Sequence, residues 1–304
     1  MDTRFLESFV MVVETGSIAE TARRLYLTPA AVAQRLRALE AEIGAPLVSR
    51  VGRTVRPTET GTAILDRAHL LLRTARELRA VEGGGVLSGS LRLGATSTAL
   101  TGLMPHILSE LMGRHPQIEL YIVPGTSVDL YHQVLRGDLD AAVIVQPQFA
   151  IPKSCDWRLL HEEPMVVLAP AARAAEDPHR LLASEPFLRY DRNHWGGQLV
   201  DRYLRAAGIR PRERFEMDAL DAIAAMVDRG LGVSLVPDWA PPWPEGLKIA
   251  KLALPLPGWV RSVGLFWVRM TPAERLVRAL GEVAVAAMEN LGRGEAPPQA
   301  VRST

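Results

Sequence analysis

Hydrophobic positions in the first 58 residues recur at helical spacing and predict three short helices. The first helix carries apolar residues on one face from Phe5 to Val13 and ends at Gly16. A capping box, Ser17-Ile18-Ala19-Glu20, begins the second helix, which runs to about residue 25. Thr28-Pro29 repeats the start signal, with a capping hydroxyl followed by a proline at the first helical position. Two short helices joined by a two-residue turn form a helix-turn-helix pattern.

The third helix has an apolar face and an opposite face suited to DNA. Its apolar stripe consists of Val32, Leu36, Leu39 and Ile43. At about 100° per residue, the outward positions are Ala30, Gln34 and Arg37, with Ala33 on the flank. Small residues let a helix approach base edges, glutamine can pair with adenine, and arginine can bind phosphate. After Gly44, residues 47–56 predict a glycine-centred hairpin that bears Arg50, Arg53 and Arg56.

Residues 58–82 predict one long helix. Glu59 places an acidic side chain near the start of the helix, where it is stabilising, and neither glycine nor proline occurs from Thr62 to Glu82. Apolar residues alternate at spacings of four and three: Ile64, Ala68, Leu71, Ala75 and Leu78. Such a short run fits either a dimerisation seam or a helix packed on its own domain, and the pattern alone is shorter than a coiled coil requires. The glycine cluster Gly83-Gly84-Gly85 then marks a domain boundary.

From residue 88 onward, strands and helices alternate. Predicted strands cover residues 91–95, 118–123 and 141–145, and the helices between them cover residues 100–114 and 129–136. A second unit adds strands at 165–168, 187–190 and 233–236, with helices at 197–207 and 219–229. A strand at 263–268 returns to the first lobe, and a last helix covers 274–288. This order predicts an α/β fold with a parallel, doubly wound sheet.

Composition and charge narrow the class of protein. A chain of 304 residues with 48% hydrophobic and 23% charged residues is too apolar for disorder and long enough for two or three domains. Its net charge of +1 excludes a basic coat over the whole chain, whereas Arg23 to Arg56 holds seven arginines against two glutamates. No apolar run approaches the roughly 20 residues of a membrane span, and the N-terminus is unlike a signal peptide. A cytoplasmic protein that binds double-stranded DNA is expected.

Candidate catalytic chemistry is sparse. Cys155 is the single cysteine, which excludes an internal disulfide framework and a cysteine zinc cluster, and it has no identifiable base partner. His161-Glu162-Glu163 lacks the spacing of a helical zinc pair. No glycine-rich nucleotide-binding motif stands out. No catalytic residue, metal or cofactor is therefore predicted, although an enzyme that uses the cleft between the lobes and carries a DNA-binding module is an alternative.

Together these motifs resemble the LysR-type transcriptional regulators. The resemblance runs through an ordered set of positions: Phe9, Gly16-Ser17, Ala22, Leu25, Thr28-Pro29-Ala30-Ala31-Val32, Leu36, Leu39-Glu40, Gly44, Leu47, Arg50, Arg53 and Pro57-Thr58-Glu59-Thr60-Gly61. It implies a winged helix-turn-helix at 1–58, a linker and dimerisation helix at 59–87, and a two-lobed, periplasmic-binding-protein-like (type 2) effector domain at 88–304. Lobe I would comprise residues 88–160 and 268–304, and lobe II residues 161–267.

The resemblance also implies which residues contact DNA. The candidates are Ser17, Thr28, Pro29, Ala30, Ala33, Gln34, Arg35, Arg37, Arg50, Arg53 and Arg56. The family often has Ser-Gln-Pro where this chain has Thr28-Pro29-Ala30, and a serine where it has Ala33. The usual glutamine contact therefore does not transfer to Pro29, and readout is expected to depend on Gln34, DNA shape and the wing arginines.

Loops at the carboxyl ends of the strands predict an effector site between the lobes. The candidate residues are Thr96, Ser97, Thr98, Gly125, Thr126, Ser127, Gln146, His194, Trp195 and Asp218. Each hydroxyl alone is most simply an ordinary helix cap, so the prediction depends on three loops converging. The family implies a small organic effector, a carboxylate or amino acid, that acts on a homodimer assembling into a homotetramer at a promoter. RNA polymerase is a further expected partner, and no membrane association is expected.

Overall fold

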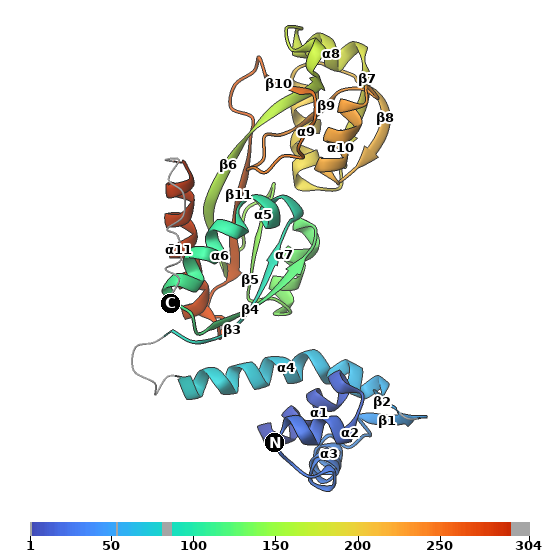
Figure 1. Ribbon diagram of the computed structural model, residues 1–304, viewed down its shortest axis with the longest axis vertical. Helices are drawn as coiled ribbons and strands as arrows, with labels where there is room; N and C mark the ends of the chain where they lie inside the picture. Colours follow the sequence, from blue (N-terminus) through green and yellow to red (C-terminus); the bar gives the residue numbers. More distant parts are fainter. Residues whose placement is uncertain (1, 53, 81–86, 293–304) are drawn as a thin grey trace. The chain divides into compact units, whose positions relative to one another are not determined.

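The computed structural model describes residues 2–52, 54–80 and 87–292, and the chain divides into two compact units, Met1–Gly89 and Ser90–Thr304 (Figure 1). Separate clusters of buried apolar residues lie in each unit. Each unit therefore folds around a core of its own. Within the described ranges, no helix is both long and apolar enough to cross a membrane.

The first unit is a helical domain with a small hairpin. Its helices are α1 (Thr3–Thr15), α2 (Ile18–Arg24), α3 (Pro29–Ile43) and α4 (Glu59–Ala80), and its hairpin consists of β1 (Val48–Val51) and β2 (Thr54–Pro57). The Ser17 hydroxyl caps α2 and the Thr28 hydroxyl caps α3, as predicted. The capping box is only half formed, because the Glu20 carboxylate binds Arg24 instead of returning to the Ser17 amide. The three helices and the hairpin predicted from the sequence are confirmed.

Helix α4 packs along part of its length on the core of its own unit. The predicted inner face of α3 is buried except at its last residue, Ile43, which is 40% exposed because the helix ends there. On α4, Ile64, Ala68 and Leu72 belong to the same apolar cluster, whereas Leu71 is exposed. The apolar stripe, for which the sequence left both a dimer seam and packing on its own domain open, is therefore divided: its first two members, Ile64 and Ala68, pack in the unit's own core. The side chain of the last member, at position 78, lies outside the described residues.

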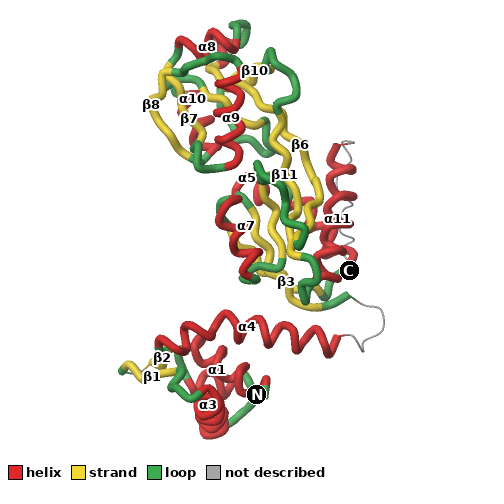
Figure 2. The backbone as a smooth tube through the Cα atoms, turned by 180° about the vertical axis from the view of Figure 1, so that it is seen from behind, coloured by secondary structure: helices red, strands yellow, loops and turns green. Residues whose placement is uncertain are grey.

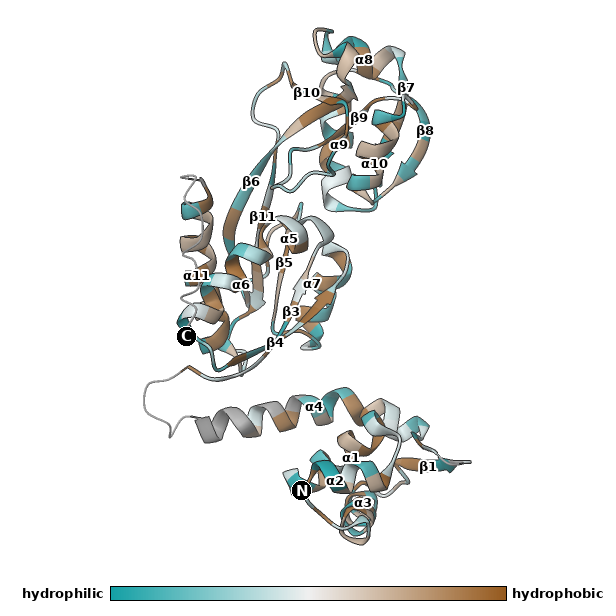
Figure 3. Cartoon of the chain, in the orientation of Figure 1, coloured by the Kyte–Doolittle hydropathy of each residue, from teal (hydrophilic) through white to brown (hydrophobic). Residues whose placement is uncertain are grey.

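The second unit contains two lobes. Lobe I contains β3 (Gly89–Ala95), α5 (Ser97–Gly102), α6 (Met104–Arg114), β4 (Ile118–Pro124), α7 (Ser127–Arg136), β5 (Ala141–Val145) and α11 (Glu274–Gly292). Every residue of β5 is apolar, and this strand lies in the middle of its sheet (Figure 3). The single helix predicted at 100–114 is wrong: Pro105, which has no amide hydrogen to donate, lies in the first turn of α6, so α5 ends before it.

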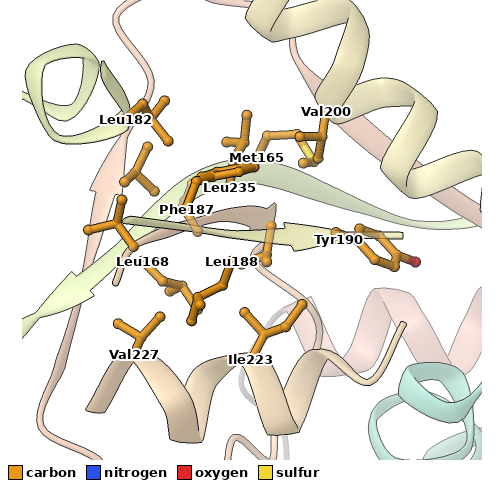
Figure 4. Packing of buried hydrophobic residues seen from close by; sticks show 14 of the residues in the cluster. Met165, Leu168, Leu182, Phe187, Leu188, Tyr190, Val200, Ile223, Val227 and Leu235 are labelled. Carbon is orange, nitrogen blue, oxygen red and sulfur yellow. The ribbon is translucent and has the colours of Figure 1, made fainter. Parts of the chain in front are cut away.

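Lobe II is built around a small parallel sheet. Its elements are η1 (Ala171–Arg173), α8 (Pro178–Ser184), β7 (Pro186–Tyr190), α9 (Trp195–Ala206), β8 (Arg212–Met217), α10 (Leu220–Asp228), β9 (Ser234–Pro237) and β10 (Ile249–Ala253). Leu188 of β7 lies on the side of Ile223 and Val227 of α10, Phe187 lies on the opposite side of the strand beside Met165 and Leu235, and the Tyr190 hydroxyl points away from this cluster (Figure 4). The sequence did not predict β8, because five of its six residues are exposed and no apolar alternation marks it.

Two long strands, β6 (Cys155–Pro170) and β11 (Val260–Val268), run from one lobe into the other (Figure 2). They pair antiparallel with each other, and β6 continues into lobe II beside β9 and β10. The sheet order is β10-β6-β11-β5-β3-β4, in which β3 and β5 are parallel but β5 and β11 are antiparallel. The parallel arrangement expected for the first unit of strands is present between β3 and β5, whereas β9 pairs antiparallel with β6, so the expectation of a second parallel unit is wrong there. The sheet is mixed because the chain enters and leaves lobe II through adjacent strands of opposite direction.

Candidate functional site

The outward face of α3 carries exposed residues suited to DNA. Pro29, Ala30, Gln34 and Arg37 are exposed, and Ala33 is half-buried. Gln34 and Arg37 form no hydrogen bond or ion pair with any other residue that the structure describes. Both side chains are therefore available to a ligand, and an amide beside a guanidinium suits a base edge and a phosphate.

The β1–β2 hairpin adds positive charge. Arg50 and Arg56 are exposed, and Arg50 pairs with Val55 across the ladder while Arg56 pairs with Ser49. Because opposite residues share a face and neighbours alternate, the two arginines project from opposite faces of the hairpin. The hairpin thus presents a cation on each face. Arg53 lies outside the described residues.

Three predicted DNA contacts have structural roles within the first unit. The Ser17 and Thr28 hydroxyls are occupied as helix caps. Arg35 is half-buried, and its Nη1 donates to the Ser8 hydroxyl on α1 at 3.3 Å. Arg35 therefore lies against α1 and is not part of the exposed face of α3.

A pocket of about 560 Å³ lies between the two lobes of the second unit. Nine of the ten effector residues predicted from the sequence line it: Thr96, Ser97, Thr98, Gly125, Thr126, Ser127, His194, Trp195 and Asp218. Gln146 instead lines a neighbouring cavity of about 390 Å³, which shares Val145, Trp195 and Arg261 with the pocket. The loops after β3 and β4 thus meet the start of α9, as expected for a site at the carboxyl ends of strands.

The hydroxyls on the lobe I side differ in how they are used. The Thr126 hydroxyl accepts from the Asp129 amide at 3.1 Å, and the Ser127 hydroxyl accepts from the Val145 amide at 3.0 Å. These two are therefore structural as well as pocket-lining. The Thr96 side chain is buried, and its Oγ1 has no hydrogen-bond partner in the part of the chain that the structure describes. A buried hydroxyl without a partner is costly, which marks Thr96 as a candidate ligand contact.

Arg261, on crossing strand β11, lines the pocket with its guanidinium group. The sequence did not predict this residue. Its side chain and that of Glu163 are each 2% exposed, and they form an ion pair at 2.5 Å. Its Nη2 donates to the Thr98 hydroxyl at 3.1 Å, and its Nη1 lies 3.5 Å from the Tyr190 hydroxyl. Burial opposes the charge of Arg261, but the Glu163 carboxylate and the Tyr190 hydroxyl together outweigh burial and raise the pKa of Arg261. Arg261 therefore stays charged and connects the crossing strand to lobe I through Thr98.

Lobe II contributes an aromatic and proline-rich wall. Trp239 and Trp243 stack with ring centroids 3.5 Å apart, and Pro242 and Pro244 line the pocket beside them. The Lys251 ammonium lies 3.5 Å from the centroid of the Trp243 ring. The sequence did not predict this wall, although the run Trp239-Ala240-Pro241-Pro242-Trp243-Pro244 begins two residues after a buried strand and could have indicated it.

The remaining polar groups of lobe II lie near the starts of α9 and α10. His194 Nε2 is 3.6 Å from Asp191 Oδ2 and 3.9 Å from Asp218 Oδ2. Asp221, in the first turn of α10, also lines the pocket and was not predicted. Burial raises the pKa of the Tyr190 hydroxyl, which therefore remains protonated and can donate.

Across the described ranges, no group of three or more acidic, histidine or cysteine side chains could hold a metal ion.

Two family profiles match the chain. The profile described as bacterial regulatory helix-turn-helix protein, lysR family, matches residues 3–62, and the profile described as LysR substrate binding domain matches residues 84–289. The chain belongs to the LysR family. It is a DNA-binding transcriptional regulator with an effector-binding domain, and its fold has the architecture that the sequence motifs implied.

Individual transcriptional regulators match between 78% and 95% of the chain. The transcriptional regulator IlvR of Caulobacter vibrioides is 31% identical over 249 residues, which cover 78% of this chain and 82% of IlvR. The dual regulator OxyR of Escherichia coli is 27% identical over 300 residues, covering 95% and 96% of the two chains. A full-length OxyR variant from Pseudomonas aeruginosa aligns with a TM-score of 0.64 at 27% identity, covering 93% of this chain and 94% of that one. The relatives are transcriptional regulators, so the comparison agrees in function class as well as fold.

The exposed arginine of α3 gives a first testable expectation for this LysR-family regulator. Replacing Arg37 with alanine should weaken DNA binding and lower the slope of log K against log salt by about 1, because one phosphate contact is lost. The slope is measured by fluorescence anisotropy over a salt series. Arg205→Ala, which removes another exposed charge from the second unit, should leave the slope unchanged. An unchanged slope for Arg37→Ala would place the DNA-facing surface elsewhere.

The contact between Gly102 and Ala240 gives a second expectation. A Cβ on Gly102, in lobe I, would lie 2.5 Å from the Ala240 carbonyl oxygen of lobe II. Gly102→Ala should therefore separate the lobes at this point and destabilise the second unit by about 1–3 kcal/mol. Gly113→Ala on α6 is the matched control, because a Cβ there meets nothing within 4 Å, and it should be neutral or stabilising. Equal unfolding midpoints for the two variants would refute the close interlobe contact.

Proposed function

We propose that the pocket between the lobes binds a small organic acid or amino acid and that this ligand controls the regulator's action at its promoter. The observation that carries the proposal is the convergence of nine predicted residues, from both lobes, on one pocket of about 560 Å³. That volume suits a small molecule. The Arg261 guanidinium and the Tyr190 and Thr98 hydroxyls supply donors for an acidic group.

The crossing strands supply a route from ligand to DNA. Because β6 and β11 connect the lobes, a ligand that binds both lobes favours one interlobe arrangement over others. The change would pass to the DNA-binding unit and alter the bending of DNA between half-sites. In this account residues 1–58 bind DNA, residues 59–87 link and dimerise, and residues 88–304 bind the effector.

The active assembly is proposed to be a homodimer that pairs into a homotetramer. A dimer presents two α3 helices to a pseudo-palindromic site. The exposed Leu71 on α4 supports an intermolecular contact on that helix. Such an assembly would act on promoter DNA in the cytoplasm, where RNA polymerase is the further partner.

The pocket is proposed to bind its ligand without transforming it. Cys155 is buried and lines neither the pocket nor the cavity beside it. The relatives include hydrogen peroxide-inducible gene activators. An internal disulfide cannot form within these 304 residues, because they contain one cysteine and a disulfide needs two.

A two-stage screen tests this function. Small acids and amino acids are first tested for a rise in the unfolding temperature of the full chain, because a ligand of the folded state stabilises it. Each hit is then added to a DNA mobility-shift titration with DNA from upstream of the regulator's own gene. A genuine effector changes the affinity or the mobility of the complex. Hits that stabilise the protein but never change the DNA complex would contradict the proposal.

A further inference from the structure

The charges around the interlobe pocket restrict its ligand more tightly than size does. Asp218, Asp221 and Arg261 line the pocket, and Glu163 is paired with Arg261. Their formal charges sum to −2, and Asp191 beside His194 adds a further negative charge. A ligand that carries only carboxylates would bring more negative charge into an already acidic space. The pocket therefore disfavours a plain organic acid.

The Arg261 end of the pocket nevertheless has unused donors. A guanidinium has five N–H groups, and within the described part of the chain Glu163, Thr98 and Tyr190 take one each. Two N–H groups on the terminal nitrogens are left, a number that matches a carboxylate. Thr96, which is 9% exposed, also lines the pocket, and its hydroxyl is without a partner among the described residues. This end therefore requires an acceptor group.

The α10 end of the pocket has unused acceptors. Asp218 is 58% exposed and its Oδ2 lies 3.9 Å from His194 Nε2, and Asp221 is exposed in the first turn of α10. Within the described residues, Asp221 has no hydrogen bond or ion pair. Two carboxylates of this kind suit an ammonium group, which has three donors and a positive charge. This end therefore requires a donor cation.

We propose that the ligand of this pocket is an amino acid or a close analogue, bound as a zwitterion. Its carboxylate would bind Arg261, Thr98 and Thr96, and its ammonium would bind Asp218 and Asp221. Its apolar part would pack on the wall from Trp239 to Pro244. This inference rests on the proposed effector role of the pocket and narrows it, because it requires a positive charge on the ligand.

Matched compounds test the inference directly. Isothermal titration of the full chain compares the twenty standard amino acids, the 2-hydroxy acids with the same side chains, and the corresponding amines without a carboxylate. At least one amino acid should bind about tenfold or more tightly than both of its matched compounds. Asp218→Asn with Asp221→Asn should cost about tenfold in amino-acid affinity and reduce the preference over the hydroxy acid. Both positions are exposed, so folding should be retained.

The control separates a local effect from a general change of charge. Glu245→Gln removes an exposed acid beside Pro244 that does not line the pocket, and it should leave the affinity unchanged. Tighter binding of a hydroxy acid than of its amino acid overturns the inference, as does an unaltered preference in the double variant or a panel in which no amino acid binds. An amino acid that binds without ever changing DNA binding would support the ligand class and contradict the proposed function.

Discussion

Replacing Glu163 with alanine is expected to lower the free energy of unfolding of the second unit by about 3–5 kcal/mol. The Glu163 and Arg261 side chains are each 2% exposed, so removing the carboxylate leaves a buried guanidinium without its counter-ion. The remaining partners, the Thr98 and Tyr190 hydroxyls, are neutral and do not replace that charge. For a unit of this size, the loss corresponds to a fall in melting temperature of about 10 °C.

Chemical denaturation of the full chain, followed by the fluorescence of the tryptophans, measures this effect because all six lie in the second unit. Glu162→Ala is the matched control: Glu162 is the exposed neighbour, and its loss should change stability by no more than about 0.5 kcal/mol. Replacing Glu163 and Arg261 together with methionine should recover much of the stability, since a buried pair can often be exchanged for apolar residues. Equal stabilities for Glu163→Ala and Glu162→Ala would show that the pair is not buried as described.

Replacing Gly61 with alanine is expected to destabilise the first unit by about 3 kcal/mol or more. A Cβ at this position in α4 would lie 2.0 Å from the Leu47 carbonyl oxygen and 3.0 Å from its carbon. That carbonyl cannot move freely, because it accepts from the Thr58 amide at 3.0 Å. The clash is therefore between two segments of backbone, and relieving it requires the hairpin and α4 to separate.

The consequence should be a loss of DNA binding together with a loss of helical signal from the first unit. Circular dichroism and DNA-binding titration of the full chain measure both. Thr62→Ala, one residue further along α4 at an exposed position, should stay within about 0.5 kcal/mol of the wild type. A fully stable Gly61→Ala variant that binds DNA normally would contradict the close packing of α4 on Leu47.

The first unit was predictable because its signals are local. Caps at Ser17 and Thr28 and an apolar stripe on α3 each lie within a few residues of the feature they define, and the structure places all of them as expected except the exposed Ile43. The hairpin and the long helix were also predicted from local patterns, and the family resemblance added their roles as wing and linker helix. What periodicity could not show is that Ile64 and Ala68 are used by the unit's own core, because an apolar stripe does not identify its partner.

The pocket was only partly predictable, for a related reason. Loops that follow strands can be found from the strands, and nine of ten such residues line the pocket. Arg261 and Glu163 are 98 positions apart and meet because β6 and β11 pair between the lobes. No local pattern reveals that pairing, because two strands so far apart in the sequence are brought together only by the tertiary fold. Asp221 looks like an ordinary acid in the first turn of a helix until the fold places it in the pocket.

The most direct test of the central claim is the salt dependence of binding between the wild-type protein and labelled DNA from just upstream of its own gene, with unrelated DNA as competitor. The account predicts tight binding that survives the competitor and whose log K falls linearly with log salt concentration. Binding that every competitor removes equally, or no binding even at low salt, would contradict a sequence-specific regulator at that site.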